Sequence, residues 1–281
     1  MTAPGLQTAR PRMSYWEASR RVFDLSLGEM LWSRRTIFMA LVVGGPVILA
    51  VIVRLLEMAG MSALRVNGQR VGGFGIFGVM IWMLFLRFIV PVLGVFYGTA
   101  LMADEVEDKT ITYLFTRPIP RGAVLIGKYL AYIACTLLVV LPSVMIVYFL
   151  LVPFSELPTT FDSLVIDLAM LALGLAVYGG VFAFVGAYFK RPLVIGLAFA
   201  FGWEQITMAM PGSLKQFTIA FYLQALVPHA MPSDGVTSLL QGMFRETPPA
   251  AVCLAWLVGY LAVFLYLATR VVERKEYVLE Q

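Results

Sequence analysis

A phosphate-binding loop is the first chemistry that this sequence suggests. Residues Gly122 to Lys128 read G-A-V-L-I-G-K and match the pattern G-x-x-x-x-G-K, in which backbone N–H groups hold phosphates. Tyr129 stands where that loop needs a Ser or Thr for magnesium, and the segment opens an apolar run instead of following a strand. We therefore expect no cofactor bound by this chain, and any ATP, with its magnesium, must bind another polypeptide.

Catalytic and metal-binding side chains are scarce. His229 is the single histidine and has no neighbouring His or Cys, so the sequence predicts no metal site. Cys135 and Cys253 lie inside apolar runs and are interpreted as packed or lipid-facing residues, not as a disulfide or a metal pair. An intramembrane protease would need a Ser–His, paired-aspartate or histidine–metal arrangement inside those runs. His229 lies outside them, so we predict no catalytic residue.

The composition indicates the environment of the chain. Of its 281 residues, 60% are hydrophobic and 14% are charged. Soluble domains have about 25% charged residues and about 45–50% apolar ones. The apolar residues also form uncharged runs of roughly 20, the length that crosses a bilayer as a helix. A membrane β-barrel would instead alternate in segments of about ten residues. The fold class predicted is an all-α polytopic membrane protein.

Six membrane-spanning helices are predicted from the apolar runs. They are Thr36–Leu56, Ile76–Ala103, Ala123–Leu151, Ser163–Phe189, Pro192–Met210 and Pro249–Thr269. Prolines within three of these spans (Pro46, Pro91 and Pro142) are tolerated where neighbouring groups satisfy the freed carbonyls.

The distribution of Lys and Arg predicts the orientation of the spans. With the N-terminus inside, 15 of the 21 basic residues lie on the inner side: Arg10, Arg12, Arg20, Arg21, Arg34, Arg35, Lys109, Arg117, Arg121, Lys128, Lys190, Arg191, Arg270, Arg274 and Lys275. Because positive charge is retained on the cytoplasmic side, both termini and residues 104–123 are predicted to be cytoplasmic. The protein is expected in the plasma membrane or bacterial inner membrane.

Three segments outside the spans carry further expectations. In Ser14–Ser33, apolar residues (Trp16, Phe23, Leu27 and Met30) recur at near-helical spacing, which predicts a helix in the inner headgroup plane. The alternative is a cytoplasmic helix packed on its own protein. Residues 60–75 form a glycine-rich outer loop. Residues 211–248 form a longer outer segment, predicted to be partly helical and apolar enough to re-enter the bilayer.

Two ionisable residues lie within predicted spans, where a charge is costly and usually faces the bundle interior or an aqueous path. At about 1.5 Å per residue, Arg87 lies roughly 16 Å and Glu204 roughly 12 Å below the outer face. They could pair, or each could bind locally and hold helices together. Trp203, beside Glu204, could pack or contact a substrate. The three are candidate residues of a translocation path.

A polar segment separates the second and third predicted spans. Four carboxylates (Asp104, Glu105, Glu107 and Asp108) come first, Tyr113, Leu114 and Phe115 follow, and Arg117-Pro118 closes the segment. Acidic residues favour the start of a helix, cations favour its end, and proline stops it. This order predicts a short cytoplasmic helix whose apolar patch suits a partner's groove. A solvated loop is the alternative, but it would not need three large apolar side chains.

The sequence here resembles the permease subunits of ABC-2 type ABC transporters. It contains Gly98-Thr99, Leu101, Asp104-Glu105, Glu107, Thr110, Tyr113-Leu114, Arg117-Pro118-Ile119, Arg121 and Gly127-Lys128 at the positions of the family's central motif. Trp203-Glu204 and Pro211-Gly212 give a second match. Lys109 departs from the glycine that the family usually has before the threonine. The six spans and the N-terminal interfacial helix resemble the same type V exporter-like architecture.

The resemblance implies a role for the polar segment. In that family it contains the coupling helix, which docks on a separate ATP-binding subunit. The implied contact residues are Asp104, Glu105, Glu107, Asp108, Thr110, Tyr113, Leu114, Phe115, Arg117, Pro118 and Arg121. Arg117 and Arg121 could pair with carboxylates of the partner or with anionic lipid.

The expected protein is therefore a permease without catalytic activity of its own, which works with ABC ATPase subunits, a second permease copy and membrane lipid, and not with nucleic acid. Its parts are a cytoplasmic N-terminus (1–35), a permease domain (36–272, with coupling loop 104–123 and outer loop 211–248) and a tail (273–281). Export is the expected activity. Maturation of an extracytoplasmic protein is an alternative, and the absence of visible internal repeats argues against an ion-coupled secondary transporter.

Overall fold

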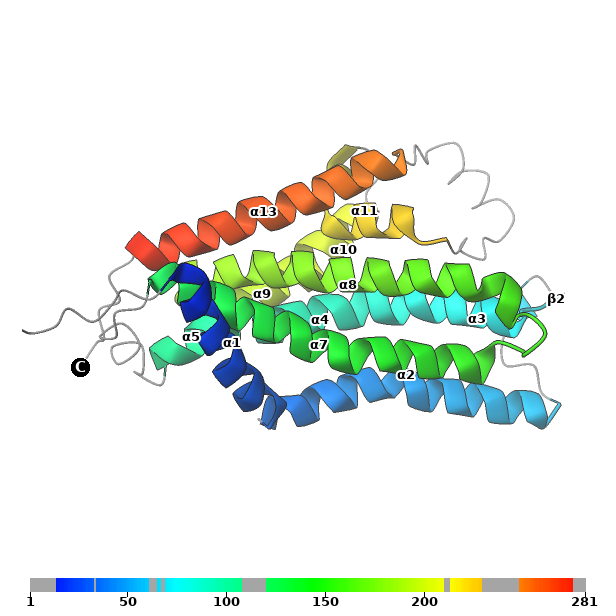
Figure 1. Ribbon diagram of the computed structural model, residues 1–281. Helices are drawn as coiled ribbons and strands as arrows, with labels where there is room; N and C mark the ends of the chain where they lie inside the picture. Colours follow the sequence, from blue (N-terminus) through cyan, green and yellow to red (C-terminus); the bar gives the residue numbers. More distant parts are fainter. Residues whose placement is uncertain are drawn as a thin grey trace, which may run out of the picture.

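Long helices that run in alternating directions form most of the computed structural model (Figure 1). It describes residues 14–32, 34–60, 65–66, 69–107, 120–209, 213–228 and 248–274. The long helices are α2 (Arg34–Met58), α7 (Arg121–Leu151), α8 (Leu157–Tyr188) and α13 (Ala250–Arg274). A further long helical run consists of α3 (Gly73–Met80), η1 (Ile81–Ile89), α4 (Val90–Leu93), η2 (Gly94–Gly98) and α5 (Ala100–Glu107). The described chain is thus helical along most of its length.

Five helices are long and apolar enough to cross a membrane, which confirms five of the predicted spans. They are Thr36–Met58, Gly73–Glu105, Arg121–Leu151, Leu157–Tyr188 and Ala250–Arg274. Most ends differ from the predicted ones by a few residues. The largest difference is at α8, which begins six residues before the predicted Ser163, because Pro158 suits the first turn of a helix. The hydroxyls of Thr159 and Thr160 also donate to the carbonyl of Glu156 there.

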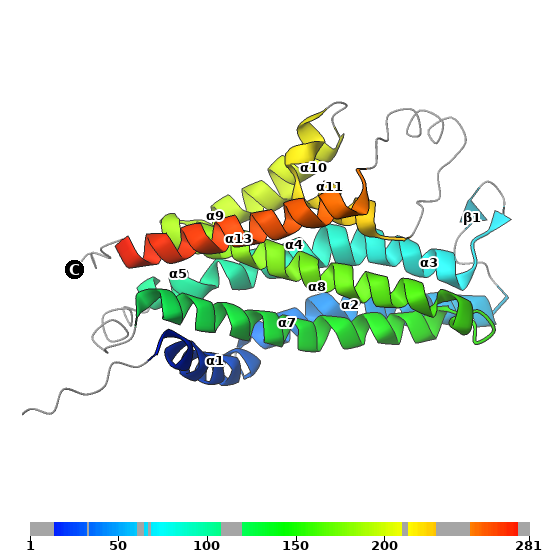
Figure 2. The same ribbon diagram turned by 45° about the horizontal axis from the view of Figure 1, so that its top comes forward.

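The fifth predicted span, Pro192–Met210, has a different form. It is helical from Pro192 to Ala209 through α9 (Pro192–Leu197), η3 (Ala198–Trp203) and α10 (Glu204–Ala209). It is not among the five helices that are long and apolar enough to cross a membrane. A 3₁₀ turn, η4 (Ser213–Phe217), and α11 (Ile219–Leu226) follow, and α11 lies beside α13 in both views (Figures 1 and 2). The buried Ile219 and Leu223 show that part of the predicted outer segment belongs to the core.

The span that contains Arg87 has two π-helical segments, η1 and η2. Pro91 has no N–H to donate to the carbonyl of Arg87, four residues earlier. A local π register is one way in which membrane helices satisfy carbonyls freed by proline. The sequence therefore accounts for an irregular helix at the membrane depth of Arg87.

Close helix packing centres on α8, which lies between α13 and the span Gly73–Glu105. A side chain at Gly186 would place its Cβ 2.3 Å from the backbone oxygen of Thr99, and one at Gly98 would place it 2.9 Å from Cβ of Phe182. A Cβ at Gly179 would lie 2.1 Å from the ring of Tyr132. Glycines therefore let η2, α7 and α8 approach one another closely, as small residues do in other membrane bundles.

The two outermost long helices are α2 and α13. Only 22% of the apolar stretch of α2 and 11% of that of α13 is buried, against 72% for the span Gly73–Glu105. The span Gly73–Glu105, called the central span below, thus forms the centre of the bundle. Helices α2 and α13 present most of their side chains outward, to lipid or to another chain.

The N-terminal helix α1 (Tyr15–Leu31) packs across α7 at the end of the bundle where α7 begins (Figure 2). Its buried residues are small: Ala18, Ser19, Val22 and Ser26. Of the predicted apolar residues (Trp16, Phe23, Leu27 and Met30), Leu27 and Met30 are partly buried and pack against the core, whereas Trp16 is 71% exposed. One face of α1 thus packs on its own protein, as in the alternative interpretation, and a position in the headgroup plane stays a prediction.

A short antiparallel pair lies in the predicted glycine-rich loop, at the opposite end of the bundle from α1 (Figures 1 and 2). Strands β1 (Arg65–Val66) and β2 (Gln69–Arg70) have two residues each, with Arg65 opposite Arg70. This hairpin is a small exception to the all-α class.

Candidate functional site

The acidic residues at the start of the polar segment continue the second span. Asp104 and Glu105 lie in α5, which ends at Glu107, so the prediction that these carboxylates begin a separate helix is wrong. Glu105 forms an ion pair with Lys128, two turns into α7. The preference of acidic residues for a helix N-terminus is worth only about 0.3–1 kcal/mol. A partly buried ion pair to the next span outweighs it.

Most of the predicted coupling residues lie outside the described residues. These are Asp108, Thr110, Tyr113, Leu114, Phe115, Arg117 and Pro118. The described structure resumes at Pro120, and Arg121 is the first residue of α7. The ends of this segment are therefore defined: it leaves α5 after Glu107 and enters α7 at Arg121.

Three elements meet where α7 begins. A Cβ at Gly122 would lie 2.9 Å from Oε1 of Glu273, near the end of α13, and 3.2 Å from the hydroxyl of Tyr15, at the start of α1. Burial raises the pKa of the Tyr15 hydroxyl above its ordinary value, and the negative charge of Glu273 raises it further. The start of α7 is thus enclosed by α1 and α13, and the described ends of the chain lie at the same end of the bundle.

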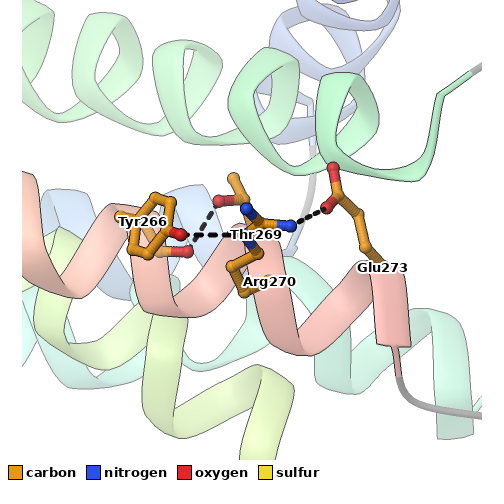
Figure 3. Close-up of polar contacts among 4 residues, drawn as sticks. All are labelled: Tyr266, Thr269, Arg270 and Glu273. Carbon is orange, nitrogen blue, oxygen red and sulfur yellow. Dashed lines mark hydrogen bonds and ion pairs between the residues drawn. The ribbon is translucent and has the colours of Figure 1, made fainter.

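Polar contacts along the last turns of α13 accompany this meeting point (Figure 3). Arg270 donates from Nε to the hydroxyl of Tyr266 at 3.0 Å, and its Nη1 lies 3.9 Å from Oε2 of Glu273. Thr269 donates to the carbonyl of Tyr266. These side chains are mostly exposed, so each contact contributes little to stability by itself. The contacts lie in the last turns of α13, which ends at Arg274, five residues beyond the predicted end at Thr269.

Helix α1 packs so closely on α7 that the backbones of the two helices nearly touch. The hydroxyl of Ser19 donates to the carbonyl of Ala123 at 3.1 Å. A Cβ at Gly127 would lie 2.5 Å from the backbone oxygen of Ser19 and 2.8 Å from Cβ of Val22. Gly127 is part of the sequence that matches a phosphate loop, but here it serves helix packing. The predicted absence of nucleotide chemistry at Gly122–Lys128 remains a prediction.

Glu204 is almost fully buried and holds two other elements. The hydroxyl of Tyr178, on α8, donates to its Oε2, and the backbone N–H of Ile219 donates to its Oε1 at 3.1 Å. Ile219 and Ala220 begin α11, where free N–H groups and the helix dipole favour a negative charge. Glu204 therefore links α10, α8 and the start of α11.

Arg87 binds a neighbour of Glu204 instead of Glu204 itself. Its Nε donates to Oε1 of Gln205 at 2.7 Å, and its guanidinium lies 5.4 Å from the ring centre of Trp82. Within the part of the chain that the structure describes, no ion pair joins Arg87 to Glu204. Of the two interpretations left open by the sequence, local bonding fits and pairing does not. The side chain of Trp203 is 45% exposed.

One buried carboxylate escaped the sequence reasoning. Asp167, on α8, is fully buried, although it lies within a predicted span between Ile166 and Leu168. The signal was present, because an acidic residue in an apolar run is as unusual as Arg87 or Glu204. Among the described residues, no group of three or more His, Cys, Asp or Glu could hold a metal ion.

Among the described residues, side-chain hydrogen bonds and an ion pair join neighbouring helices of the bundle. Residues 26–277, which are 252 of the 281, match the family model described as "ABC-2 family transporter protein". No curated protein sequence matches the chain significantly. Because the match covers most of the chain, the comparison establishes the family. The chain is a membrane protein that belongs to the ABC-2 family of transporters.

Proposed function

We propose that this chain is the permease subunit of an ABC exporter, driven by a separate ATP-binding subunit that docks on residues 104–121. ATP and magnesium then bind the partner, and this chain has no catalytic activity of its own. Two permease copies, identical or related, form the transport path in a plasma membrane or bacterial inner membrane. Both termini and residues 104–121 face the cytoplasm.

The observation that carries the proposal is the attachment of the polar segment to rigid helices at both ends. On one side, α5 continues the central span without a break and Glu105 pairs with Lys128. On the other side, α7 begins between Tyr15 of α1 and Glu273 of α13. A force applied by a partner to residues 108–119 would therefore reach both the second and the third span.

Docking by this segment also suits its residue types. Tyr113, Leu114 and Phe115 are large apolar residues between charged ones, and such anchors contribute most of the binding energy at protein interfaces. The flanking charges would set the register and orientation of the partner.

The experiment is a purification of tagged permease from its native membrane. We expect a separate ABC ATPase to co-purify, ATP hydrolysis by the complex, and none by the permease after the partner is removed. Hydrolysis by the permease alone, or a permease that never retains an ATPase under mild extraction, would exclude the proposed mechanism.

A further inference from the structure

Arg87 has an unusual position for a charged side chain. It lies in the middle of the central span, 14 residues after Gly73 and 18 residues before Glu105. At about 1.5 Å per residue, these separations are roughly 21 and 27 Å along the helix. An arginine near a helix end can extend its guanidinium to the headgroups, but one at mid-span is too far from either surface. Its charge must be balanced within the membrane.

The protein balances that charge only in part. A guanidinium has five N–H donors, and the described residues accept a hydrogen bond from one of them, the Nε bonded to Gln205. Gln205 and the ring of Trp82 are both neutral. Among the described side chains, no carboxylate forms an ion pair with Arg87. Glu204 is directed to Tyr178 and to the N–H of Ile219, so its charge is used elsewhere.

Exposed aromatic side chains lie next to Arg87 on the surface of the bundle. Arg87 itself is partly exposed, and Phe88, next to it, is 47% exposed. The ring of Phe88 lies 6.0 Å from the ring of Phe201, which is 37% exposed, so η1 and η3 meet at this face. The face thus combines one unneutralised cation with large apolar surfaces.

We propose that Arg87 binds the oxyanion of an anionic amphiphile whose apolar or aromatic body lies on the face formed by Phe88 and Phe201. A phosphate, sulfate or carboxylate suits the planar donor fork of arginine, which binds two oxygens at once. Gln205 and Trp82 hold the guanidinium in place without cancelling its charge. A cationic amphiphile would leave the charge of Arg87 unpaired and add a second positive charge. The inference rests on the proposed transport function and names a substrate class for it.

The test measures binding to the purified permease without any ATPase, in nanodiscs of neutral phosphatidylcholine. The probes are three amphiphiles with the same bromoalkyl chain and different heads: phosphate, trimethylammonium and maltoside. Bromine quenches tryptophan fluorescence on contact, and the Trp82→Phe variant reports how much of the quenching comes from this site, because the Trp82 ring lies 5.4 Å from the guanidinium of Arg87. We expect the phosphate to bind at least about tenfold more tightly than the ammonium, a difference of about 1.4 kcal/mol.

Variants of the arginine sharpen the test. Arg87→Gln should remove the preference for phosphate and leave maltoside binding unchanged, and Arg87→Lys should retain part of the preference because it keeps the charge without the fork. Arg54→Gln is the matched control, since Arg54 lies at the outer end of α2 and pairs with Glu57 at 3.7 Å. It should change nothing. If Arg87→Gln is poorly recovered, the inference is still tested by the affinities of the wild type for the phosphate and ammonium probes and by the same measurement on Arg87→Lys.

Two results would overturn the inference: equal affinity of the wild type for phosphate and ammonium, or an undiminished phosphate preference in Arg87→Gln. Nanodiscs of phosphatidylglycerol separate two sources of the oxyanion. Loss of probe binding there identifies a membrane lipid headgroup as the occupant, and unchanged binding identifies a free amphiphile. Either result supports the oxyanion site. Because no ATPase takes part, failure here leaves the proposed docking untouched.

Discussion

Glu105 of α5 and Lys128 of α7 form an ion pair across the segment that connects the second and third spans. The chain between these helices leaves α5 after Glu107 and enters α7 at Arg121, so the pair closes the base of the segment. Both side chains are largely buried, with exposed fractions of 20% and 12%. Such a pair is expected to fix the distance between the two spans at this end of the bundle.

Glu105→Gln or Lys128→Met alone should lower the free energy of unfolding by about 1–3 kcal/mol, because each leaves a partly buried charge without its partner. Each should also reduce permease-stimulated ATP hydrolysis by the complex. The exchanged pair, Glu105→Lys with Lys128→Glu, should recover at least half of both losses. Thermal unfolding and ATPase assays measure this. If the exchanged pair loses as much stability and stimulated hydrolysis as the sum of the two single variants, the contact has no coupling role.

Gly127 should accept no side chain. In Gly127→Ala, the new Cβ meets the backbone of Ser19, so α1 must move away from α7, at a cost of about 1–3 kcal/mol. The control is Gly28→Ala, because a Cβ at Gly28 meets nothing within 4 Å. Gly28→Ala should be neutral or slightly stabilising. Thermal unfolding and protease cleavage near α1 report the outcome, and equal stability of the two variants would disprove this packing.

Tyr178 and Glu204 should behave as a coupled pair. Tyr178→Phe removes one hydrogen bond to the buried carboxylate and should lower stability by about 1–3 kcal/mol. With Glu204→Gln already present, the same change should cost clearly less, as in a double-mutant cycle between bonded residues. Tyr222→Phe is the matched control, since the Tyr222 hydroxyl has no hydrogen bond to a described residue. Additive losses from Tyr178→Phe and Glu204→Gln would contradict the bond.

The orientation of the bundle is tested by labelling single cysteines in sealed cells. Gln69→Cys, in the β hairpin, should react with a membrane-impermeant maleimide added outside. Arg274→Cys, at the end of α13, should react only after the membrane is opened, because positively charged segments stay inside. The native Cys135 and Cys253 are buried and should stay unlabelled. The opposite labelling pattern would reverse the proposed topology.

Much of the fold was predictable because apolar runs must be helical to cross a bilayer. The five spans follow from this rule. The contact of α1 was less predictable, since Ala18, Ser19 and Val22 give a weak hydrophobic signal, and their importance depends on Gly127 in a distant segment. The small residues that matter for close approach are not the large ones that define an amphipathic pattern.

The polar contacts within the bundle could be foreseen only as a set of candidates. Arg87 and Glu204 stood out as charges in apolar runs, but helix rotation decides which neighbour each one reaches. In the folded chain Arg87 reaches Gln205, and Glu204 reaches Tyr178 and the start of α11. The position of Asp104 and Glu105 at the end of α5 also depends on a distant residue, Lys128.

Docking of the ATPase on residues 104–121 is tested most directly by the double replacement Leu114→Asp with Phe115→Asp. Burying each apolar side chain contributes about 1.5–3 kcal/mol, and a carboxylate in the same groove adds a desolvation cost. We expect the double variant to insert normally into the membrane. Its affinity for the ATPase should fall by at least about a hundredfold, so the ATPase no longer co-purifies and its hydrolysis is not stimulated. Co-purification at wild-type stoichiometry with stimulated hydrolysis retained would contradict the account.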